Sequence, residues 1–327
     1  MKKLFTITLS FCMLLALSAC GGCERSNEDI GHEDVKEEQV SAQVELADPF
    51  VMLHDGRYYA YGTHSDDGIE VYVSDDLHDW NYRGLALEKT NAWGDKWFWA
   101  PEVYYVDGTF YMYYSSDEHI CVATSESPEG PFVNVGDDPM LTTEGAIDNS
   151  LFIDDDGTPY LLFVRFTDGN DIWIAELKED LTTIKQETMT HCFNVTEPWE
   201  EIWPRVVEGP FIIKHKGLYY MTYSANSYES PDYAVGYATA SSPMGPWTKS
   251  EANPILHKPG ELVGVGHSAL FRDKAGALKK VFHAHNQPGT IHPRLMYITD
   301  VTFVEGEDGA DKMEISNEYI TPRLEIK

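Results

Sequence analysis

The clearest regularity in the sequence is a pair of short apolar runs joined by a turn that contains glycine. In its best copy, the runs Phe211–Ile213 and Leu218–Ser224 flank the turn Lys214–Gly217. Both runs are rich in β-branched and aromatic residues, and a turn glycine between two such runs is typical of a β-hairpin. The sequence therefore predicts a hairpin here, with Glu208 at the start of its first strand.

The hairpin pattern occurs five times. Each copy has a turn glycine followed by a β-rich run, and the fifth run, Val281–His283, is the weakest. The turn glycines are Gly56, Gly108, Gly157, Gly217 and Gly276, which places them 52, 49, 60 and 59 residues apart. Self-similarity at a period near 50 residues is typical of propellers and other repeat folds.

Each copy continues into a third apolar run, and two copies close with similar phrases. The third runs are Ile69–Ser74, His119–Ser125, Asp171–Leu177, Tyr233–Ala240 and Arg294–Asp300. We expect a short fourth strand in each of the closing phrases, Ser127–Phe132 and Ser242–Trp247. Helical periodicity is nearly absent, so five units of about four strands predict an all-β fold, a five-bladed β-propeller. A β-sandwich is the alternative, but it would not need so regular a repeat.

The first 45 residues lack the hairpin pattern. Lys2 and Lys3 precede the apolar run Leu4–Leu17, which is too short and wrongly flanked for a spanning helix and predicts an export signal over residues 1–19. The signal ends in Leu-Ser-Ala-Cys, which resembles a bacterial lipobox. The resemblance implies cleavage before Cys20, lipidation of its thiol and anchoring to a bacterial membrane. An ordinary secretory signal with an incidental cysteine is the alternative.

Residues 20–45 are rich in Glu, Asp, Ser and Gly and have no apolar period. We expect a disordered, lipidated tether there, and a catalytic propeller domain over 46–327. Only about 25 residues follow the fifth repeat, so we expect no accessory sugar-binding domain after it. Cys121 and Cys192 have no spacing that indicates a disulfide or a metal site, and we expect buried free thiols.

Charge and composition narrow the possible partners. The formal net charge is −30, and removal of Lys2 and Lys3 with the signal makes it −32. Such acidity argues against nucleic acids and other anionic polymers and suits a neutral substrate. With 43% hydrophobic residues, the folded part can bury a large core, and we expect a monomer.

A propeller brings the starts of its first strands together, because the first strand of each blade lines the central channel. Counting back eight or nine positions from the turn glycines gives Asp48, Trp99 with Ala100, Asp148, Glu208 and His267. Three carboxylates and one imidazole should therefore converge at one end of the axis. Like charges in a low-dielectric funnel destabilise a scaffold, so the set indicates a functional site. A channel ion or a polar water cluster is the alternative.

Converging carboxylates are the minimum apparatus for hydrolysing a glycosidic bond. One carboxyl group protonates the leaving oxygen, and the other activates water or attacks the sugar. The two groups must differ in pKa, and a third carboxylate can set the difference by raising the pKa of its neighbour.

Four stretches of the sequence resemble glycoside hydrolase family 43. They are ADPFV at 47–51, WAPEV at 99–103, IDNSLFID at 147–154 and VEGPFIIKHKGLYY at 207–220. The resemblance covers residues 44–303. It implies a five-bladed propeller enzyme that acts on arabinose- and xylose-containing polysaccharides, inverts anomeric configuration and needs no organic cofactor.

The resemblance also implies roles for six residues. Asp48 matches the general base that activates water, Glu208 the general acid, and Asp148 the carboxylate that orients and tunes the acid. An inverting mechanism places the carboxyl groups of Asp48 and Glu208 about 6.5–9.5 Å apart. Trp99 matches an aromatic wall of the sugar pocket, Arg294 an arginine that contacts sugar hydroxyls, and His267 a channel histidine associated with a structural calcium ion.

The last three roles have ordinary structural alternatives. Trp99 could fill the core, Arg294 could pair with a surface acid, and a single histidine is more often a hydrogen-bonded core residue than a metal ligand. Glu102 lies two residues beyond the channel-lining position and could form a channel hydrogen bond instead of joining the chemistry.

Three functions stay open from the sequence. The first is an exo-acting α-L-arabinofuranosidase, with β-xylosidase close to it. The second is an endo-acting arabinanase or xylanase, and the third is a surface propeller that binds carbohydrate without cleaving it. The carboxylate triad disfavours the third, because a pure binding site needs aromatic platforms and neutral hydrogen bonders. The segments 81–98, with Trp93 and Trp97, and 227–232 are candidate walls that would close the pocket for exo action.

Overall fold

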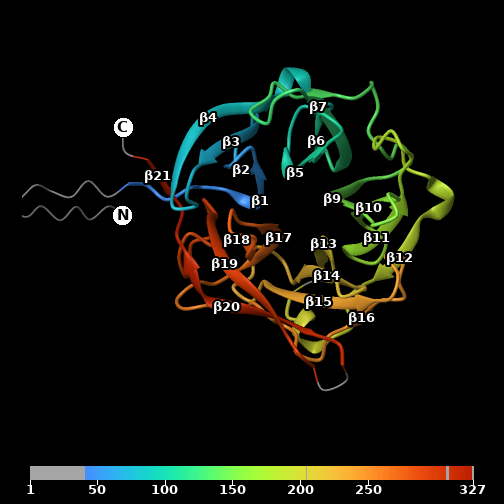
Figure 1. Cartoon of the computed structure of the whole chain (residues 1–327), viewed down its shortest axis with the longest axis vertical. Helices are drawn as coiled ribbons and strands as arrows, with labels where there is room; N and C mark the ends of the chain where they lie inside the picture. The colour runs from blue at the N-terminus through green and yellow to red at the C-terminus, as the bar shows by residue number, and fades with distance from the viewer. Residues whose placement is uncertain (1–40, 204, 307–308, 326–327) are drawn as a thin grey trace, which may run out of the picture. The chain divides into compact units, whose positions relative to one another are not determined.

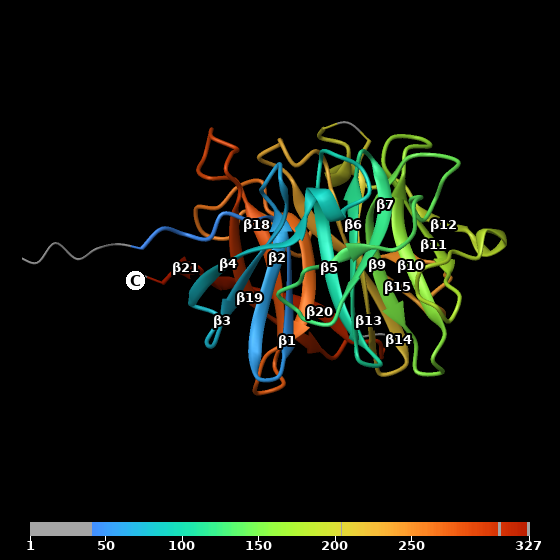
Figure 2. The same ribbon diagram turned by 90° about the horizontal axis from the view of Figure 1, so that it is seen from above.

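The computed structural model describes residues 41–203, 205–306 and 309–325, all within a compact unit that begins at Val40. Five sheets, antiparallel except for one short edge strand in the first, surround a central axis, which confirms the five-bladed β-propeller (Figure 1). In the second to fifth sheets four strands follow one another in chain order, and the first sheet has a fifth strand from the C-terminal segment. Figure 2 shows the strands running between two faces that carry the loops.

The innermost strand of each blade is the first in sequence, and the next two follow outward. The first strands are β1 (Ala47–His54), β5 (Trp99–Val106), β9 (Ala146–Ile153), β13 (Val207–His215) and β17 (Gly266–Arg272). The second strands are β2 (Arg57–Thr63), β6 (Thr109–Ser116), β10 (Pro159–Arg165), β14 (Leu218–Ala225) and β18 (Leu278–Ala284). The third strands are β3 (Gly68–Ser74), β7 (His119–Ser125), β11 (Asp171–Glu176), β15 (Ala234–Ala240) and β19 (Leu295–Val304).

All five predicted hairpins are present, as first- and second-strand pairs with the expected glycine in each turn. Gly217, for example, has a φ of +83°, a conformation that costs little only for glycine. The repeated turn glycine is therefore a backbone requirement of the hairpin, and this is why the period was visible in the sequence.

The outermost strands differ most from the prediction. They are β4 (Asp79–Glu88), β8 (Val133–Asn134), β12 (Thr190–Phe193), β16 (Thr248–Lys249) and β20 (Lys312–Ile320). The phrases expected to hold the fourth strands of blades two and four are turns, and β8 and β16 begin one residue after them. Proline has no N–H to give to a sheet, so a phrase with two prolines cannot pair as a strand.

The C-terminal segment completes the first blade. Strand β21 (Arg323–Leu324) lies parallel to β4, and Gln43 forms a bridge with Arg323. Val44 is fully buried and its N–H donates to the carbonyl of Pro322. The folded unit therefore includes residues 43–45, which the sequence had assigned to the tether. The expectations for the signal at 1–19 and for Cys20 lie outside the described residues and stay predictions.

The core lies between neighbouring sheets. One hydrophobic cluster joins blades one, two and five, a second joins blades three and four, and a third joins blades two and three. Burial of apolar area at these contacts, at about 25 cal/mol per Å², stabilises the ring. Cys121 and Cys192 are both free thiols, as expected, but only Cys121 is buried and Cys192 is half-buried.

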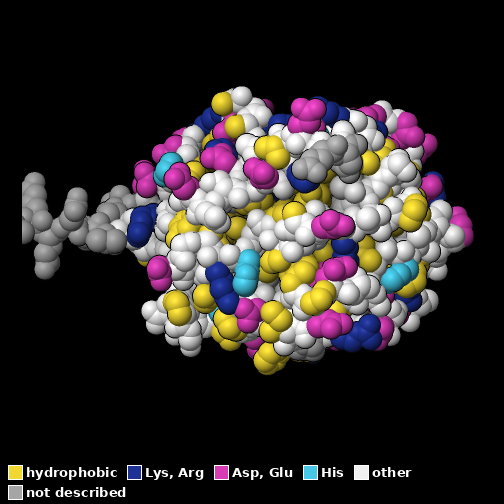
Figure 3. All heavy atoms as spheres, turned by 90° about the horizontal axis from the view of Figure 1, so that it is seen from below, with side chains coloured by type: hydrophobic (Ala, Val, Ile, Leu, Met, Phe, Trp, Pro, Cys, Tyr) yellow, Lys and Arg dark blue, Asp and Glu magenta, His cyan; other side chains and the backbone are white. Residues whose placement is uncertain are grey.

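The surface carries charges of both signs. On the face shown in Figure 3, acidic side chains are scattered among basic and hydrophobic ones rather than gathered in one patch. The described part of the chain contains three short helices: η1 (Lys89–Asn91), η2 (Gln186–Thr188) and η3 (Pro198–Glu200). Within residues 41–203, 205–306 and 309–325, no helix is long and apolar enough to cross a bilayer.

Candidate active site

The five first strands share one irregularity near the end at which they start. In each, the pairing with the second strand breaks and leaves two residues unpaired, which is a β-bulge. The first bulge residue of each blade has a positive φ: Asp48 47°, Ala100 45°, Asp148 58°, Gly209 56° and His267 40°. Bulges re-aim side chains and are common next to active sites. Four of the five predicted channel-lining positions include such a bulge residue: Asp48, Ala100, Asp148 and His267.

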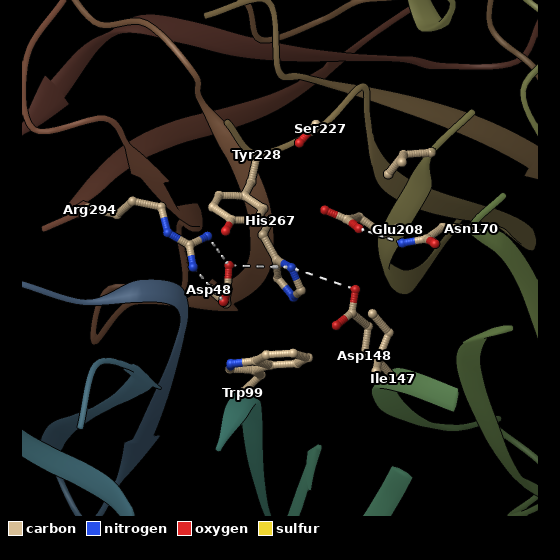
Figure 4. Close-up of a pocket in the computed structure, with 11 residues that line it drawn as sticks. Asp48, Trp99, Ile147, Asp148, Asn170, Glu208, Ser227, Tyr228, His267 and Arg294 are labelled. Carbon is tan, nitrogen blue, oxygen red and sulfur yellow. Dashed lines mark hydrogen bonds and ion pairs between the residues drawn. The ribbon is translucent and has the colours of Figure 1, made fainter. Parts of the chain in front are cut away.

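A pocket of about 290 Å³ opens at this end of the ring (Figure 4). The six residues singled out from the sequence, Asp48, Trp99, Asp148, Glu208, His267 and Arg294, all line it. Five further residues complete the lining: Ile147, Asn170, Val206, Ser227 and Tyr228. The structure therefore brings together residues from all five blades, although their chemical roles remain predictions.

Asp48 lies in a positively charged corner of the pocket. Arg294 donates to both of its oxygens, with Nη1 2.8 Å from Oδ1 and Nη2 3.3 Å from Oδ2. Burial opposes the charge of this carboxylate, but Arg294, His267 and His283 outweigh it and hold the pKa of Asp48 well below its usual value. Asp48 is therefore ionised at any pH near neutrality.

Glu208 lies on the opposite side of the pocket from Arg294 (Figure 4) and contacts neutral donors. Its Oε1 accepts a hydrogen bond of 2.8 Å from Tyr233 Oη, and its Oε2 one of 3.1 Å from Asn170 Nδ2. Burial, followed by the charge of Asp148, raises the pKa of Glu208 to about 7. Glu208 can therefore hold a proton at neutral pH and give it to a leaving group.

Asp148 and His267 connect the two sides. His267 Nδ1 lies 3.6 Å from Asp48 Oδ1 and 3.8 Å from Asp148 Oδ2. Asp148 Oδ2 also accepts the backbone N–H of Gly209 at 3.2 Å. Burial and the charge of Asp48 raise the pKa of Asp148 to about 7. The imidazole thus lies next to both aspartates, and Asp148 is electrostatically coupled to Glu208.

The surroundings of His267 bear on the calcium hypothesis. Calcium prefers six to eight oxygen ligands. The part of the chain that the structure describes contains no group of three or more His, Cys, Asp and Glu side chains arranged to hold a metal ion. The side chains of this region do not by themselves make an oxygen cage, so calcium at His267 stays a prediction and no step below uses it.

Two aromatic residues form walls of the pocket. Trp99 is stacked on Trp97, with ring centroids 5.5 Å apart and an interplanar angle of 15°, and Lys96 Nζ lies 3.8 Å from the centroid of the Trp97 ring. Trp97 therefore backs Trp99 and is not itself part of the pocket lining. On another side, Tyr228 packs its ring against the Arg294 guanidinium at 4.5 Å.

Only one of the two candidate wall segments contributes residues to the pocket lining. Segment 227–232 supplies Ser227 and Tyr228 to the lining, whereas segment 81–98 supplies none of the lining residues. Glu102 also lies outside the lining and accepts a hydrogen bond from Tyr104, as the channel interpretation allowed. Burial raises the pKa of Glu102 to about 8.

Sequence reasoning missed three residues that position the carboxylates. Asn170 and Tyr233 bind Glu208, and the ring of His283 accepts the backbone N–H of Asp48 at 3.0 Å. His283 was visible only as the end of the weakest repeat. A comparison of the residues on the second strands that pair with the position just before each bulge would have found it, because that position is polar in four of the five blades.

The arrangement can carry out acid–base chemistry on a bond held between Asp48 and Glu208. One group stays ionised because of a bidentate guanidinium, and the other retains a proton because of burial and a like charge. A pair of carboxyl groups with opposite protonation states is what hydrolysis of a glycosidic bond requires.

Comparison with known proteins finds relatives that are named as glycosidases. A solved structure described as an endo-1,4-β-xylanase from Bacteroides thetaiotaomicron is 48% identical, with a TM-score of 0.82, over 88% of this chain and 99% of that one. A β-D-galactofuranosidase of Aspergillus niger is 28% identical over 72% of this chain and 73% of its own length. A probable arabinan endo-1,5-α-L-arabinosidase of Aspergillus fumigatus is 26% identical over 68% of this chain and 72% of its own.

The family comparison matches nearly the whole propeller. The model of glycosyl hydrolases family 43 matches residues 39–308, which include all six of the predicted site residues. Together with the 48% identical relative, this match agrees with the five-bladed fold. The chain therefore belongs to glycosyl hydrolases family 43 and is a glycoside hydrolase.

Proposed function

We propose that this glycoside hydrolase inverts the anomeric carbon of arabinose- or xylose-containing oligosaccharides and polysaccharides, and that it is an exo-acting α-L-arabinofuranosidase. The observation that carries the mechanism is the contrast between Asp48, which is paired with Arg294, and Glu208, whose pKa is raised to about 7. A non-catalytic binding propeller would not need this contrast.

In the proposed reaction, Asp48 removes a proton from a water molecule as that water attacks the anomeric carbon. Glu208 gives its proton to the glycosidic oxygen, which leaves with the rest of the saccharide. Asp148 keeps the pKa of Glu208 high enough for it to be protonated near pH 7. The wall formed by Trp99 packs against the sugar ring and excludes water from that side.

The compact pocket supports exo action. Its volume of about 290 Å³ is at the lower end of the usual range for small-molecule sites, and Ser227 and Tyr228 add to its rim. A pocket of this kind suits one terminal sugar better than a long stretch of polymer. The substrate named for the 48% identical relative, a β-1,4-xylan cut internally, supports an endo-xylanase as the second candidate.

A substrate panel with product analysis separates these candidates. Aryl α-L-arabinofuranosides and β-D-xylosides should be tested beside defined oligosaccharides of arabinan and xylan. An exo-arabinofuranosidase releases only arabinose from the first time point, whereas an endo-xylanase releases a ladder of xylo-oligosaccharides. Binding of these saccharides without any cleavage would reject both enzymes in favour of a binding propeller.

A further inference from the structure

Neighbouring blades are joined by a repeated hydrogen bond at the bulges. The N–H of the first bulge residue is donated to a side chain on the second strand of the preceding blade. This bond joins Ala100 to Thr63 Oγ1 at 2.9 Å, Asp148 to Ser115 Oγ at 3.0 Å, His267 to Ser224 Oγ at 2.8 Å and Asp48 to His283 Nδ1 at 3.0 Å. Four of the five junctions therefore use the same bond.

The accepting side chains occupy one equivalent position. Each belongs to the residue that pairs with the position just before the bulge: Thr63 with Ala47, Ser115 with Trp99, Ser224 with Glu208 and His283 with Gly266. In the third blade the residue that pairs with Ile147 is Val164. Val164 is fully buried among the apolar side chains between blades three and four and has no hydrogen-bond acceptor in its side chain.

The fifth junction consequently forms a different bond. The N–H of Gly209, the first bulge residue of blade four, is donated to Asp148 Oδ2 at 3.2 Å. A buried N–H without a partner costs free energy, so this group must find an acceptor near the bulge. Because Val164 provides none, the N–H goes to the carboxylate of the neighbouring bulge residue.

We propose that Val164 is a positioning residue for the reaction. Its side chain lacks the hydrogen-bond acceptor that the other four junctions have, so the Gly209 N–H binds Asp148 instead. This bond fixes the Asp148 carboxylate beside Glu208 and His267. This inference rests on the proposed roles of Asp148 and Glu208. It concerns a residue that touches neither the substrate nor the pocket.

The hydrogen bond between Gly209 and Asp148 also affects the pKa of Glu208. The Gly209 N–H favours the charged form of Asp148 and lowers its pKa, against burial and the charge of Asp48. The charge of Asp148, in turn, follows burial as the second cause that raises the pKa of Glu208. Loss of the Gly209 bond would make Asp148 more often neutral, and Glu208 would then lose its proton at a lower pH.

The test is a pair of reciprocal substitutions at equivalent positions, one that adds a hydroxyl and one that removes it. Val164→Thr introduces the hydroxyl that three of the other junctions use, and Thr63→Val removes it from the junction whose donor, Ala100, has no ionisable side chain. On a natural-type oligosaccharide that the wild type cleaves, Val164→Thr should reduce kcat about tenfold, and the alkaline limb of its pH profile should move to lower pH by about half to one unit. Thr63→Val should lower the melting temperature and leave the alkaline limb in place.

A spectroscopic measurement follows the bond itself. In wild-type protein labelled with ¹⁵N-glycine, the Gly209 amide proton should shift as Asp148 titrates, and in Val164→Thr this shift should disappear. If the amide titration and the alkaline limb were both the same as in the wild type, Val164 would have no positioning role.

Two smaller variants keep the test decisive if Val164→Thr does not fold. Val164→Ser and Val164→Ala leave similar cavities, but only the serine can accept the Gly209 N–H. We expect the displaced alkaline limb in Val164→Ser alone, and identical limbs in the two variants would overturn the proposal. A wild type that cleaves no glycoside would reject the proposed function instead, which is a different outcome.

Discussion

On the two sides of the pocket, two carboxyl groups have opposite protonation states: Asp48 is ionised and Glu208 retains a proton. Asp48 and Glu208 are both almost fully buried, at 8% and 9% exposed. Burial is the largest influence on each and favours the neutral form. Asp48 nevertheless stays charged because it faces a bidentate guanidinium, whereas Glu208 faces neutral donors and the charge of Asp148.

This comparison shows that burial does not decide the roles. Both carboxyl groups begin near one another in acidity and are equally desolvated, so the neighbouring charges select the base and the acid. Removal of either group, or of the neighbours that distinguish them, should therefore change activity in distinct and recognisable ways.

The largest effect should come from removing the base. Asp48→Ala should lower kcat/KM by at least about 10³-fold on every substrate, because water must be activated whatever group leaves. The loss should be equal on a natural oligosaccharide and on an aryl glycoside with an acidic phenol. Asp66→Ala, which removes an exposed loop carboxylate, serves as the control and should retain full activity.

Removal of the acid should be selective. Glu208→Ala should lower kcat/KM by about 10²- to 10⁴-fold on natural oligosaccharides, whose leaving oxygen needs a proton. It should spare most activity on aryl glycosides with acidic phenols, since these depart unaided. If Glu208→Ala lost both substrate classes equally and Asp48→Ala spared the aryl glycosides, the two roles would be reversed.

Removal of the guanidinium should weaken the base without deleting it. Burial raises the pKa of Asp48, and Arg294 is the main group that lowers it. In Arg294→Met this pKa therefore rises, and Asp48 is protonated at a higher pH. Activity requires the ionised form, so the acidic limb of the pH profile should move upward, with a loss of about 10- to 100-fold at mildly acidic pH. Arg272→Met, at an exposed arginine, should leave the profile unchanged. An unmoved acidic limb in Arg294→Met would contradict the account of Asp48.

The smallest effect should come from a neutral donor to the acid. The hydroxyl of Tyr233 favours the charged form of Glu208 and lowers its pKa. Tyr233→Phe should therefore raise that pKa, and the alkaline limb of the pH profile should move to higher pH by about one unit or less. Tyr219→Phe, which removes a hydroxyl bonded to Asp154 away from the pocket, is the matched control. A downward shift in Tyr233→Phe would contradict the surroundings assigned to Glu208.

The fold was predictable because it is built from a hairpin that recurs five times and is specified by residues close together in the sequence. Turn glycines such as Gly217 and the aromatic runs behind them mark every hairpin, and hairpins depend on residues close in sequence. The outer strands were less predictable, since β8 and β16 are two residues long and β21 pairs with a strand more than 200 residues away. Such pairings are decided by tertiary contacts that leave no local pattern.

The same distinction applies to the site. Asp48, Asp148 and His267 were found because the bulge places them eight or nine residues before the turn glycine, and Glu208 stands one residue before the equivalent position. Tyr233 and Asn170 were missed because they reach Glu208 from loops and strand ends outside that register. Arg294 was found through the family resemblance, but its bidentate contact with Asp48 could not be foreseen from the sequence.

The most direct test of the central claim, that Asp48 activates water while Glu208 donates a proton, is the configuration of the first-formed product. Proton NMR during the first turnovers of the wild type, on the glycoside it cleaves best, should show the sugar released with inverted anomeric configuration before mutarotation begins. Release of the retained anomer would mean that a carboxylate attacks the sugar directly, and the water-activating role of Asp48 would then have to be abandoned.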